Sequence, residues 1–396
     1  MTAGEPRLYL DFNAGAPLLA EARAAAIAAL DAANPSSVHA EGRRSRAIVE
    51  DSRRAVAEAV GAAPQNVVFT SGATEAAVMA LSPLWLIDGV ETGLAHLAVV
   101  DTDHPCIREG GQFSAEAVAR LPVDADGIVD IAAVAAFAAR CDAERPGLLA
   151  LTLGNSETGV MQPLDRIKAA IAGRNVRLVV DAVQALGRVP VDVAELGADA
   201  LLISGHKLGA LKGVGALILR AGSTRPLPLL RGGGQEGGRR AGTESVAAIA
   251  SLGAAVRVAM ARVAAEPLRL RQLRDHLETA IRQRVPDAIV LGADAERLPN
   301  TVALALPGLR AETAQMALDL AGIAVSSGSA CSSGKVGRSH VIEGMVAGGL
   351  AIAADEGALR VSFGYDTSQA ELDRFADAYV ALAGRRRGQG SHDRAA

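Results

Sequence analysis

Lysine is almost absent from this sequence of 396 residues, which has four lysines against 36 arginines. Two of the four, Lys207 and Lys212, lie in one short segment of small residues that follows an apolar run. Arginine stays protonated and is not a nucleophile, whereas a desolvated lysine can lose its proton and condense with a carbonyl compound. Lys207 is therefore a candidate Schiff-base residue, and an ordinary surface lysine is the alternative.

Cysteine, long apolar runs and an excess of one charge are scarce as well. Three cysteines without a Cys-x-x-Cys pair argue against a disulfide framework and against a zinc knuckle. No run approaches about 18 apolar residues, and residues 1–10 lack the apolar stretch of a signal peptide, so we expect a cytoplasmic protein without a membrane partner. A net charge of −4 gives no reason to expect a nucleic-acid partner.

Apolar segments with strand character alternate with segments of helical periodicity, which predicts an α/β architecture. A continuous helical pattern over residues 245–284 then leads into a second, smaller set of elements, with a boundary expected near residue 256, and the polar residues 385–396 are expected to form a disordered tail. The predicted strands are 66–70, 97–100, 148–153, 178–181, 200–204 and 215–219, and the predicted helices are 20–33, 43–60, 76–87 and 131–140.

The apolar segment 176–181 ends in Asp181, and Gln184 follows three residues later. A carboxylate at the carboxyl end of a buried strand can pair with the protonated ring nitrogen of a pyridine cofactor. The amide of Gln184 would then bond the ring hydroxyl. A helix or turn cap is the alternative function of Asp181.

Residues 66–70 predict a strand that passes through a turn of small residues, Ser71 to Glu75, into a helix. Backbone N–H groups at such a turn, together with the start of a helix, favour a phosphate group. Ala73 and Thr74 are the candidate residues of this cradle, and Ser204, His206 and Thr243 are candidates to complete it. An ordinary capping box made by Ser71 and Thr74 is the alternative.

Taken in order, these segments resemble the cysteine desulfurases, a branch of the class V aminotransferase group among the fold-type I pyridoxal-phosphate (PLP) enzymes. The resemblance covers nearly the whole chain. It implies a homodimer in which a large domain (14–256) has a mostly parallel seven-stranded sheet wrapped by helices, with a smaller α+β domain made of 1–13 and 257–384. The matching segments are 9–14, 34–39, 70–75, 103–104, 155–159, 181 with 184, 204–207, 232–243, 327–334 and 359–364.

The resemblance also assigns roles to individual residues. Lys207 would bind PLP as a Schiff base, and His104, which is otherwise a loop histidine before Pro105, would stack on the ring and shuttle protons. The planar fork of an arginine suits a substrate carboxylate. Asp181 would bind the pyridine nitrogen of PLP and Gln184 its phenolic oxygen. The phosphate would be bound by Ala73, Thr74, Ser204 and His206, and Thr243 would bind the phosphate in the partner subunit. Asn155 and Arg360 would bind the substrate carboxylate.

Cys331 distinguishes this resemblance from ordinary transaminases. It lies in a segment of serine and glycine, residues 326–337, that is expected to form an exposed mobile loop. The resemblance implies that its thiolate attacks the sulfur of L-cysteine, which leaves L-alanine and a persulfide whose sulfur passes to an iron–sulfur scaffold or another acceptor protein. No resident metal is expected, apart from transient contact of Cys331 with an iron–sulfur cluster. Cys106 and Cys141 are expected to be packing residues.

Two positions depart from the family pattern. Gly15 stands where relatives have a hydroxyl residue, and Leu211 stands where they commonly have proline. These departures leave open a related PLP lyase or transaminase, such as a selenocysteine lyase, and a PLP-binding assembly partner without catalysis. The presence of Lys207, Cys331 and Arg360 together argues against the inactive protein.

Overall fold

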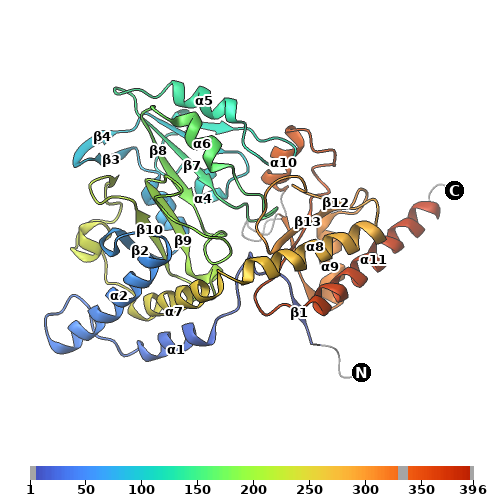
Figure 1. Ribbon diagram of the computed structural model, residues 1–396, viewed down its shortest axis with the longest axis horizontal. Coiled ribbons are helices and arrows are strands. Elements are labelled where there is room, and N and C mark those ends of the chain that lie inside the picture. Colours follow the sequence, from blue (N-terminus) through green and yellow to red (C-terminus); the bar gives the residue numbers. More distant parts are fainter. Residues whose placement is uncertain (1–5, 329–337, 393–396) are drawn as a thin grey trace.

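The computed structural model describes residues 6–328 and 338–392. Figure 1 shows two lobes: one is built around a large sheet, and the other contains a small sheet and the long helix α11 (Gln369–His392). Both ends of the described chain lie on the second lobe (Figure 1). Cys331 lies outside the described residues.

The large sheet has seven strands in the order β2-β10-β9-β8-β7-β5-β6. Strand β10 runs antiparallel to both β2 and β9 and the other neighbouring pairs are parallel, so the sheet is mixed and mostly parallel, as predicted. The six predicted strands form as β2, β5, β7, β8, β9 and β10, and β6 is an additional strand. The strands are β2 (Val67–Thr70), β5 (His96–Val100), β6 (Val118–Leu121), β7 (Gly147–Thr152), β8 (Val176–Asp181), β9 (Ala200–Ser204) and β10 (Gly215–Leu219).

Both faces of this sheet are buried, which explains why its strands are apolar without alternation in the sequence. Within β7, Leu149 and Leu151 belong to one core cluster, and their neighbours Leu148 and Ala150 belong to another on the opposite face. Successive side chains of a strand point to opposite faces, so each face receives its own set of apolar residues.

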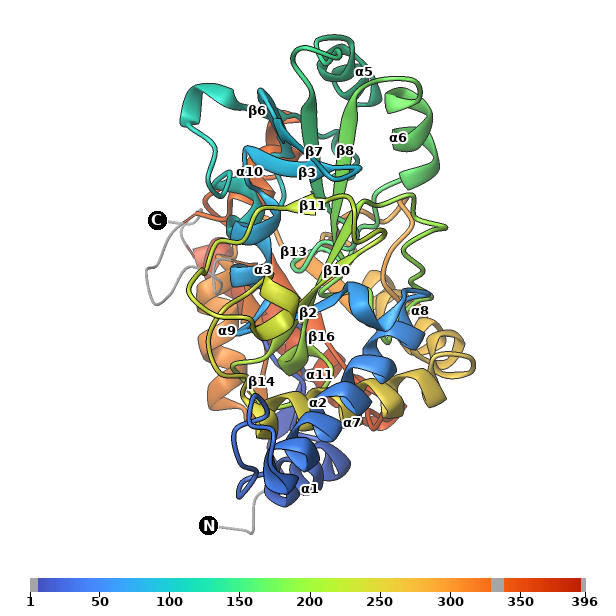
Figure 2. The ribbon, with the colours of Figure 1, turned by 90° about the vertical axis from the view of Figure 1, so that its left-hand side faces the viewer.

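Helices cover the two faces unequally, and Figure 2 shows α2 and α7 side by side beneath the sheet. The first cluster includes side chains from α1, α2, α5, α6 and α7, whereas the second includes side chains from the shorter α3 and α4. These helices are α1 (Ala20–Ala28), α2 (Ala40–Ala59), α3 (Ala73–Ala80), α4 (Pro105–Arg108), α5 (Ile131–Ala139), α6 (Leu164–Ile171) and α7 (Val246–Arg262).

The small sheet is antiparallel, in the order β12-β13-β16-β15, and has its own apolar core with α8, α9 and α11. Leu8 and Leu10, near the start of the chain, belong to this core because β1 pairs with β14. The elements are β1 (Leu8–Tyr9), α8 (Glu266–Arg284), β12 (Ile289–Val290), β13 (Thr301–Ala305), α9 (Ala311–Leu320), β14 (Ile323–Ala324), β15 (Ser326–Ser327) and β16 (Leu359–Ser362). Helix α10 (His340–Ala347) instead packs its buried side chains into the first cluster of the large sheet.

The structure differs from the predicted helix over 76–87. Helix α3 ends at Ala80, and the residues after Pro83 form a strand instead. Proline at this position interrupts the helical hydrogen bonds, and the following apolar residues pair within a separate three-stranded sheet. This sheet contains β3 (Leu84–Ile87), β4 (Val90–Gly93) and β11 (Arg225–Pro226).

The predicted continuous helix over 245–284 is divided into α7 and α8, which meet at an angle of 75°. Pro267 lies in the first turn of α8, where its missing N–H is not needed. The boundary expected at residue 256 thus falls inside α7, and the division into domains stays a prediction. At the carboxyl end, a disordered tail is expected from residue 385, but helix α11 continues to His392.

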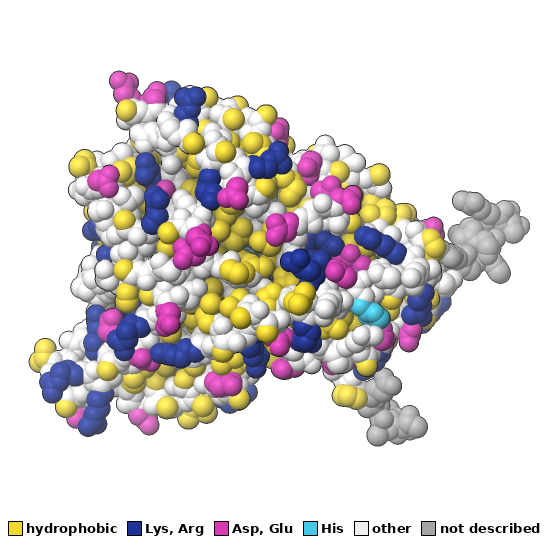
Figure 3. Space-filling model, viewed as in Figure 1, with side chains coloured by type: hydrophobic (Ala, Val, Ile, Leu, Met, Phe, Trp, Pro, Cys, Tyr) yellow, Lys and Arg dark blue, Asp and Glu magenta, His cyan; other side chains and the backbone are white. Residues whose placement is uncertain are grey.

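In the described part of the chain, no individual helix combines the length and hydropathy needed to cross a membrane, and only the bent pair of α7 and α8 passes that test jointly, by length and composition. On the face shown in Figure 3, basic and acidic side chains are interspersed around apolar ones. The mixture agrees with the small net charge of −4.

Candidate active site

A cavity of about 470 Å³ opens where the large sheet's strands end, beside the last residues of β7, β8 and β9. Ligands in α/β proteins bind at this edge because the strand-to-helix connections meet there. Most of the predicted site residues line this cavity together: Ala73, Thr74, His104, Asp181, Gln184, Ser204, His206 and Lys207.

Lys207 ends the short 3-10 helix η3 (Gly205–Lys207), which directly follows β9. Its Nζ donates hydrogen bonds to the backbone oxygen of Asn13 at 2.5 Å and to that of Ala14 at 3.0 Å. Gln184 Nε2 donates to the same Asn13 oxygen at 3.0 Å. The segment around Asn13 therefore holds both the candidate Schiff-base lysine and the candidate ring-hydroxyl ligand, a connection that sequence reasoning did not identify.

Asp181 is 3% exposed at the end of β8. Its Oδ1 accepts a hydrogen bond from the backbone N–H of Val183 at 2.9 Å, which is the turn-capping contact expected of the alternative function. Among the described residues, no hydrogen bond to Oδ2 is found. Burial raises the pKa of Asp181 to about 6, although the Val183 N–H and the charge of Lys207 act in the opposite direction. A cationic ring nitrogen beside Oδ2 would compensate the buried charge.

His104 caps the start of α4 and is largely buried. Its Nδ1 accepts a hydrogen bond from the Cys106 backbone N–H at 3.2 Å and lies 3.0 Å from Cys106 Sγ. Burial and the neighbouring Lys207 lower the pKa of His104 to about 4, so the imidazole is neutral at pH 7. Cys106 lines the cavity too, but burial raises the pKa of its thiol far above neutrality, which keeps it protonated.

The start of α3 has the features of an anion site. Gly72 is its N-cap residue and no side chain caps it, so the capping-box alternative is wrong. Glu75 accepts a hydrogen bond from the Ser71 N–H at 2.6 Å. Among the described residues, no side chain caps the N–H groups of Ala73 and Thr74 at the start of the helix. Ser204 and His206 line the same cavity, and Ser204 Oγ lies 2.9 Å from His206 Nδ1.

The predicted carboxylate ligands do not line the cavity as the structure stands. Arg360, on β16, is 1% exposed; it forms a 2.6 Å ion pair with Asp11 and donates to the Ser156 backbone oxygen at 3.0 Å. The side chain of Asn155 is occupied locally, because its Oδ1 accepts from two backbone N–H groups and its Nδ2 donates to the Thr102 oxygen. Ser156 itself lines the cavity, so both residues stand directly behind its wall.

Thr243, another predicted residue, stands apart from this cavity. Thr243 is exposed in a neighbouring hollow with Arg240 and Glu244. Cys331 lies outside the described residues, between Gly328 and Ser339.

Glu157 was not identified from the sequence, although it lies within the matching segment 155–159. Its side chain is buried, and Ser339 Oγ donates to its Oε2 at 2.6 Å. A side chain on Gly328 would contact the same carboxylate. Burial raises the pKa of Glu157 to about 7, against the effects of Ser339 and Arg360.

Comparison with known proteins identifies the family of this chain. The profile of the family described as Aminotransferase class-V matches residues 8–375. A cysteine desulfurase of Cereibacter sphaeroides is 40% identical over 93% of both chains, and the cysteine desulfurase IscS of Dictyoglomus turgidum is 35% identical over 92% of both. The structure of a NifS-like protein from Rickettsia africae superposes with a TM-score of 0.83 at 27% identity, covering 94% of this chain and 98% of that one.

The chain therefore belongs to the class-V aminotransferases, and within them to the cysteine desulfurases, as the resemblance in its sequence predicts. Enzymes of this family depend on PLP, and the described residues fit that cofactor. Asp181 has an oxygen available for a ring nitrogen, and the uncapped start of α3 is available for a phosphate. Around Gly72 and Gly213 there is open space where a side chain would stand.

Proposed function

We propose that this protein removes sulfur from L-cysteine, releases L-alanine and passes the sulfur through a persulfide on Cys331 to an acceptor protein. The observation that carries the proposal is the convergence of Lys207, Asp181 and the uncapped start of α3 on one cavity. The membership of the chain among cysteine desulfurases supports the choice of substrate.

PLP, when bound, supplies an electron sink that stabilises negative charge on the substrate carbon atoms. Lys207 would hold it covalently, Asp181 Oδ2 would accept the hydrogen bond of its ring nitrogen, and Gln184 would bond its phenolic oxygen. Ala73, Thr74, Ser204 and His206 would bind its phosphate. The neutral state of His206, whose pKa burial and Lys207 lower to about 4, allows the imidazole to donate through Nε2 while Nδ1 accepts from Ser204.

Proton movement would depend on Lys207 and His104. Once substrate has released Lys207, its amine can take and return a proton, and the nearby oxygens of Asn13 and Ala14 hold it on the cavity side of β9. In the neutral His104, Nδ1 accepts a hydrogen bond from the Cys106 N–H, so the ring proton lies on Nε2, which would donate a hydrogen bond to a bound group. His104 can take up a proton only at Nδ1, after the Cys106 hydrogen bond opens.

Substrate would bind through its carboxylate to Arg360. For this, Arg360 must exchange Asp11, which it contacts through Nη2 and Oδ1, for the substrate, so one carboxylate would replace another beside the guanidinium. Asn155 would bind the same carboxylate only after its local hydrogen bonds open; in the described arrangement it shapes the turn that presents Ser156.

Sulfur transfer would require the Cys331 thiolate to attack the substrate sulfur. An S–S bond forms as the substrate C–S bond breaks; the carbon keeps the electron pair and takes a proton, which gives alanine. An acceptor thiol then takes the outer sulfur and leaves Cys331 as a thiol. We also propose that the protein is a cytoplasmic homodimer, that Thr243 contacts the partner subunit's phosphate site, and that the acceptor serves iron–sulfur clusters or related sulfur compounds.

The test is the release of alanine and sulfide from L-cysteine with a reductant, measured for the PLP-loaded wild type, Lys207→Ala and Cys331→Ala. We expect equal amounts of both products from the wild type and none from Lys207→Ala. Cys331→Ala should keep the visible absorbance of bound PLP and lose sulfide release. Full release by Cys331→Ala would show that the persulfide step is wrong, and loss of the absorbance would show that the variant is damaged elsewhere.

A further inference from the structure

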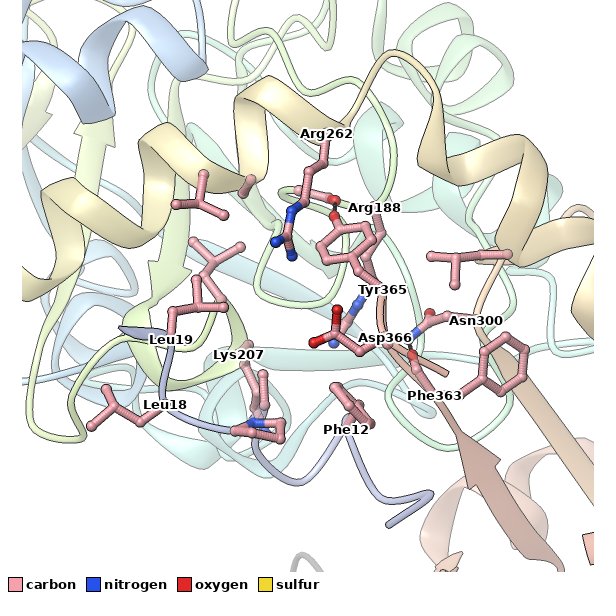
Figure 4. A pocket seen from close by; sticks show the side chains of 18 of the residues that line it. Phe12, Leu18, Leu19, Arg188, Lys207, Arg262, Asn300, Phe363, Tyr365 and Asp366 are labelled. Atoms are coloured by element: carbon pink, nitrogen blue, oxygen red, sulfur yellow. Dashed lines mark hydrogen bonds between the residues drawn. The ribbon is translucent and has the colours of Figure 1, made fainter. Parts of the chain in front are cut away.

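A second cavity, of about 360 Å³, lies on the other side of Lys207, and among the described residues only Lys207 lines both cavities. Figure 4 shows side chains from three distant parts of the chain around it: Phe12 and Leu19 near the start, Arg262 from α7, and Phe363 to Asp366 after β16. Its volume falls within the range of about 300–1,000 Å³ typical of small-molecule sites. None of the roles assigned above uses this space.

Two arginines of this cavity have no carboxylate partner among the described residues. Arg188 is 7% exposed, and its recorded hydrogen bonds are both made by Nη1, to the backbone oxygen and Oε1 of Gln184. The Arg262 guanidinium carbon lies 5.1 Å from the centre of the Tyr365 ring (Figure 4). A buried guanidinium without a counter-ion is costly, and burial lowers the pKa of Arg188 to about 10 accordingly.

The other walls define what an anion here would look like. Most are apolar, among them Leu186, Leu270 and Phe363. Two carboxylates, Glu21 and Asp366, also line the cavity, but both are exposed to solvent and neither forms an ion pair with the arginines in the described structure. The buried side therefore offers positive charge and an apolar surface, and the open side offers screened negative charge.

We propose that this cavity binds a small carboxylate with a short aliphatic body. Its carboxylate would lie against Arg188 and Arg262, because guanidinium groups bind carboxylates through paired N–H donors. Its aliphatic part would contact the leucine and phenylalanine side chains.

Such a ligand would affect the PLP site through a continuous set of hydrogen bonds. Arg188 donates to Gln184 Oε1, and Gln184 Nε2 donates to the Asn13 backbone oxygen, so Arg188 helps to fix the amide that is proposed to bond the phenolic oxygen of PLP. A carboxylate that draws Arg188 away from Gln184 changes the hydrogen bonding of the residues proposed to hold the cofactor. We expect its binding to be visible in the absorbance of bound PLP.

The experiment is a calorimetric titration of the PLP-loaded protein with butanoate, which has no amine and cannot condense with the cofactor. Butanamide is the matched neutral ligand. We expect butanoate to bind once per chain. Butanamide should bind to the wild type at least about tenfold more weakly than butanoate, and butanoate should bind to Arg262→Gln at least about tenfold more weakly than to the wild type. In each case a charge-assisted hydrogen bond is lost. Asp366→Asn should bind butanoate more tightly, because a repelling charge is removed.

Arg360→Lys is the control for the carboxylate site of the proposed reaction. The proposal holds if butanoate binds to Arg360→Lys as tightly as to the wild type, and if it perturbs the PLP absorbance of both proteins but not that of Arg262→Gln. This result does not depend on whether the protein acts on cysteine. Binding lost in Arg360→Lys but kept in Arg262→Gln would place butanoate in the active site and overturn it. The proposal would also be overturned if butanamide bound as tightly as butanoate, or if Asp366→Asn bound butanoate more weakly than the wild type. The absence of binding heat at butanoate concentrations up to about 50 mM would overturn it too, because the affinity would then be weaker than millimolar.

Discussion

At the scale of single residues, burial controls the protonation states around Lys207. Asp181 and His104 are both desolvated, with opposite consequences: the pKa of the carboxyl is raised to about 6 and that of the imidazole is lowered to about 4. Desolvation disfavours the charged form of either group. The site thus prepares a carboxylate that gains from a cationic partner and a histidine that is neutral before substrate arrives.

Replacing Asp181 with asparagine tests this arrangement. We expect Asp181→Asn to keep the shape of the site and to bind PLP, but to lower kcat by a factor of at least about 100, because the ring nitrogen loses the charge that keeps it protonated. The measurement is the initial rate of alanine formation at saturating cysteine, together with the absorbance of the bound cofactor. An unchanged kcat would remove Asp181 from the proposed contact with the ring.

At the scale of elements, a buried ion pair joins α2 to the start of the phosphate cradle. Arg53 of α2 pairs with Glu236, in the 3-10 helix η4 (Gln235–Gly238), through two hydrogen bonds of 2.7 and 2.9 Å. Glu236 also accepts from the backbone N–H of Phe69 in β2, which leads to α3. Glu236 has a φ of 51°, an uncommon conformation for a residue with a side chain, so these contacts hold a locally unfavourable backbone.

Breaking this pair from one side should be severe. Arg53→Met leaves the buried Glu236 carboxylate without its cationic partner and is expected to lower the free energy of unfolding by about 3–5 kcal/mol. Denaturant unfolding of the PLP-loaded protein measures the change. Arg54→Met is the matched control, because its i,i+3 pair with Asp51 is exposed and should contribute at most about 1 kcal/mol. The double variant Arg53→Met with Glu236→Gln should recover part of the loss; no recovery would contradict the pairing.

At the scale of the whole molecule, the two cores meet around the candidate active site. Arg360 on the small sheet reaches Asp11 and Ser156, and Glu157 beside Ser156 receives a hydrogen bond from Ser339, where α10 begins. These contacts connect segments that are far apart in the sequence. A buried carboxyl in such a place links the stability of the whole fold to pH.

Glu157 should make the protein less stable as the pH rises. Its pKa is about 7 in the folded protein and 4.5 as an ordinary glutamate, so the folded state binds the extra proton between these values. Stability from this group is complete below about pH 4.5 and is lost as the pH rises to about 7, by at most about 3 kcal/mol. Glu157→Gln should reduce the measured slope by this contribution, as determined by unfolding at several pH values; the buried Asp103 and Asp181, whose pKa values burial raises to about 7 and about 6, contribute the remainder. The exposed Glu343 on α10 provides the control variant Glu343→Gln, and an identical slope in Glu157→Gln would contradict the linkage.

Much of the fold could be predicted because its strands and helices carry their own signals. The apolar segments before Asp181 and Ser204 form strands where expected, since a sheet buried on both faces needs such runs. The helix after Ala73 was predicted too long, because the pairing of β3 with β4 and β11 outweighs the local helical pattern. The break between α7 and α8 depends on which core each helix joins, and local periodicity does not contain that information.

The sequence by itself determined the chemistry available to this protein. A lysine retained in a chain of arginines, an aspartate that ends an apolar strand and a turn of small residues before a helix define a cofactor-binding type, because each depends on residues close together in the chain. The tertiary structure alone decided how these groups meet: that Lys207 and Gln184 share the oxygen of Asn13, that Arg360 is engaged by Asp11, and that a second cavity opens behind Lys207. Such contacts join residues far apart in the sequence, and their geometry follows from how the two cores pack.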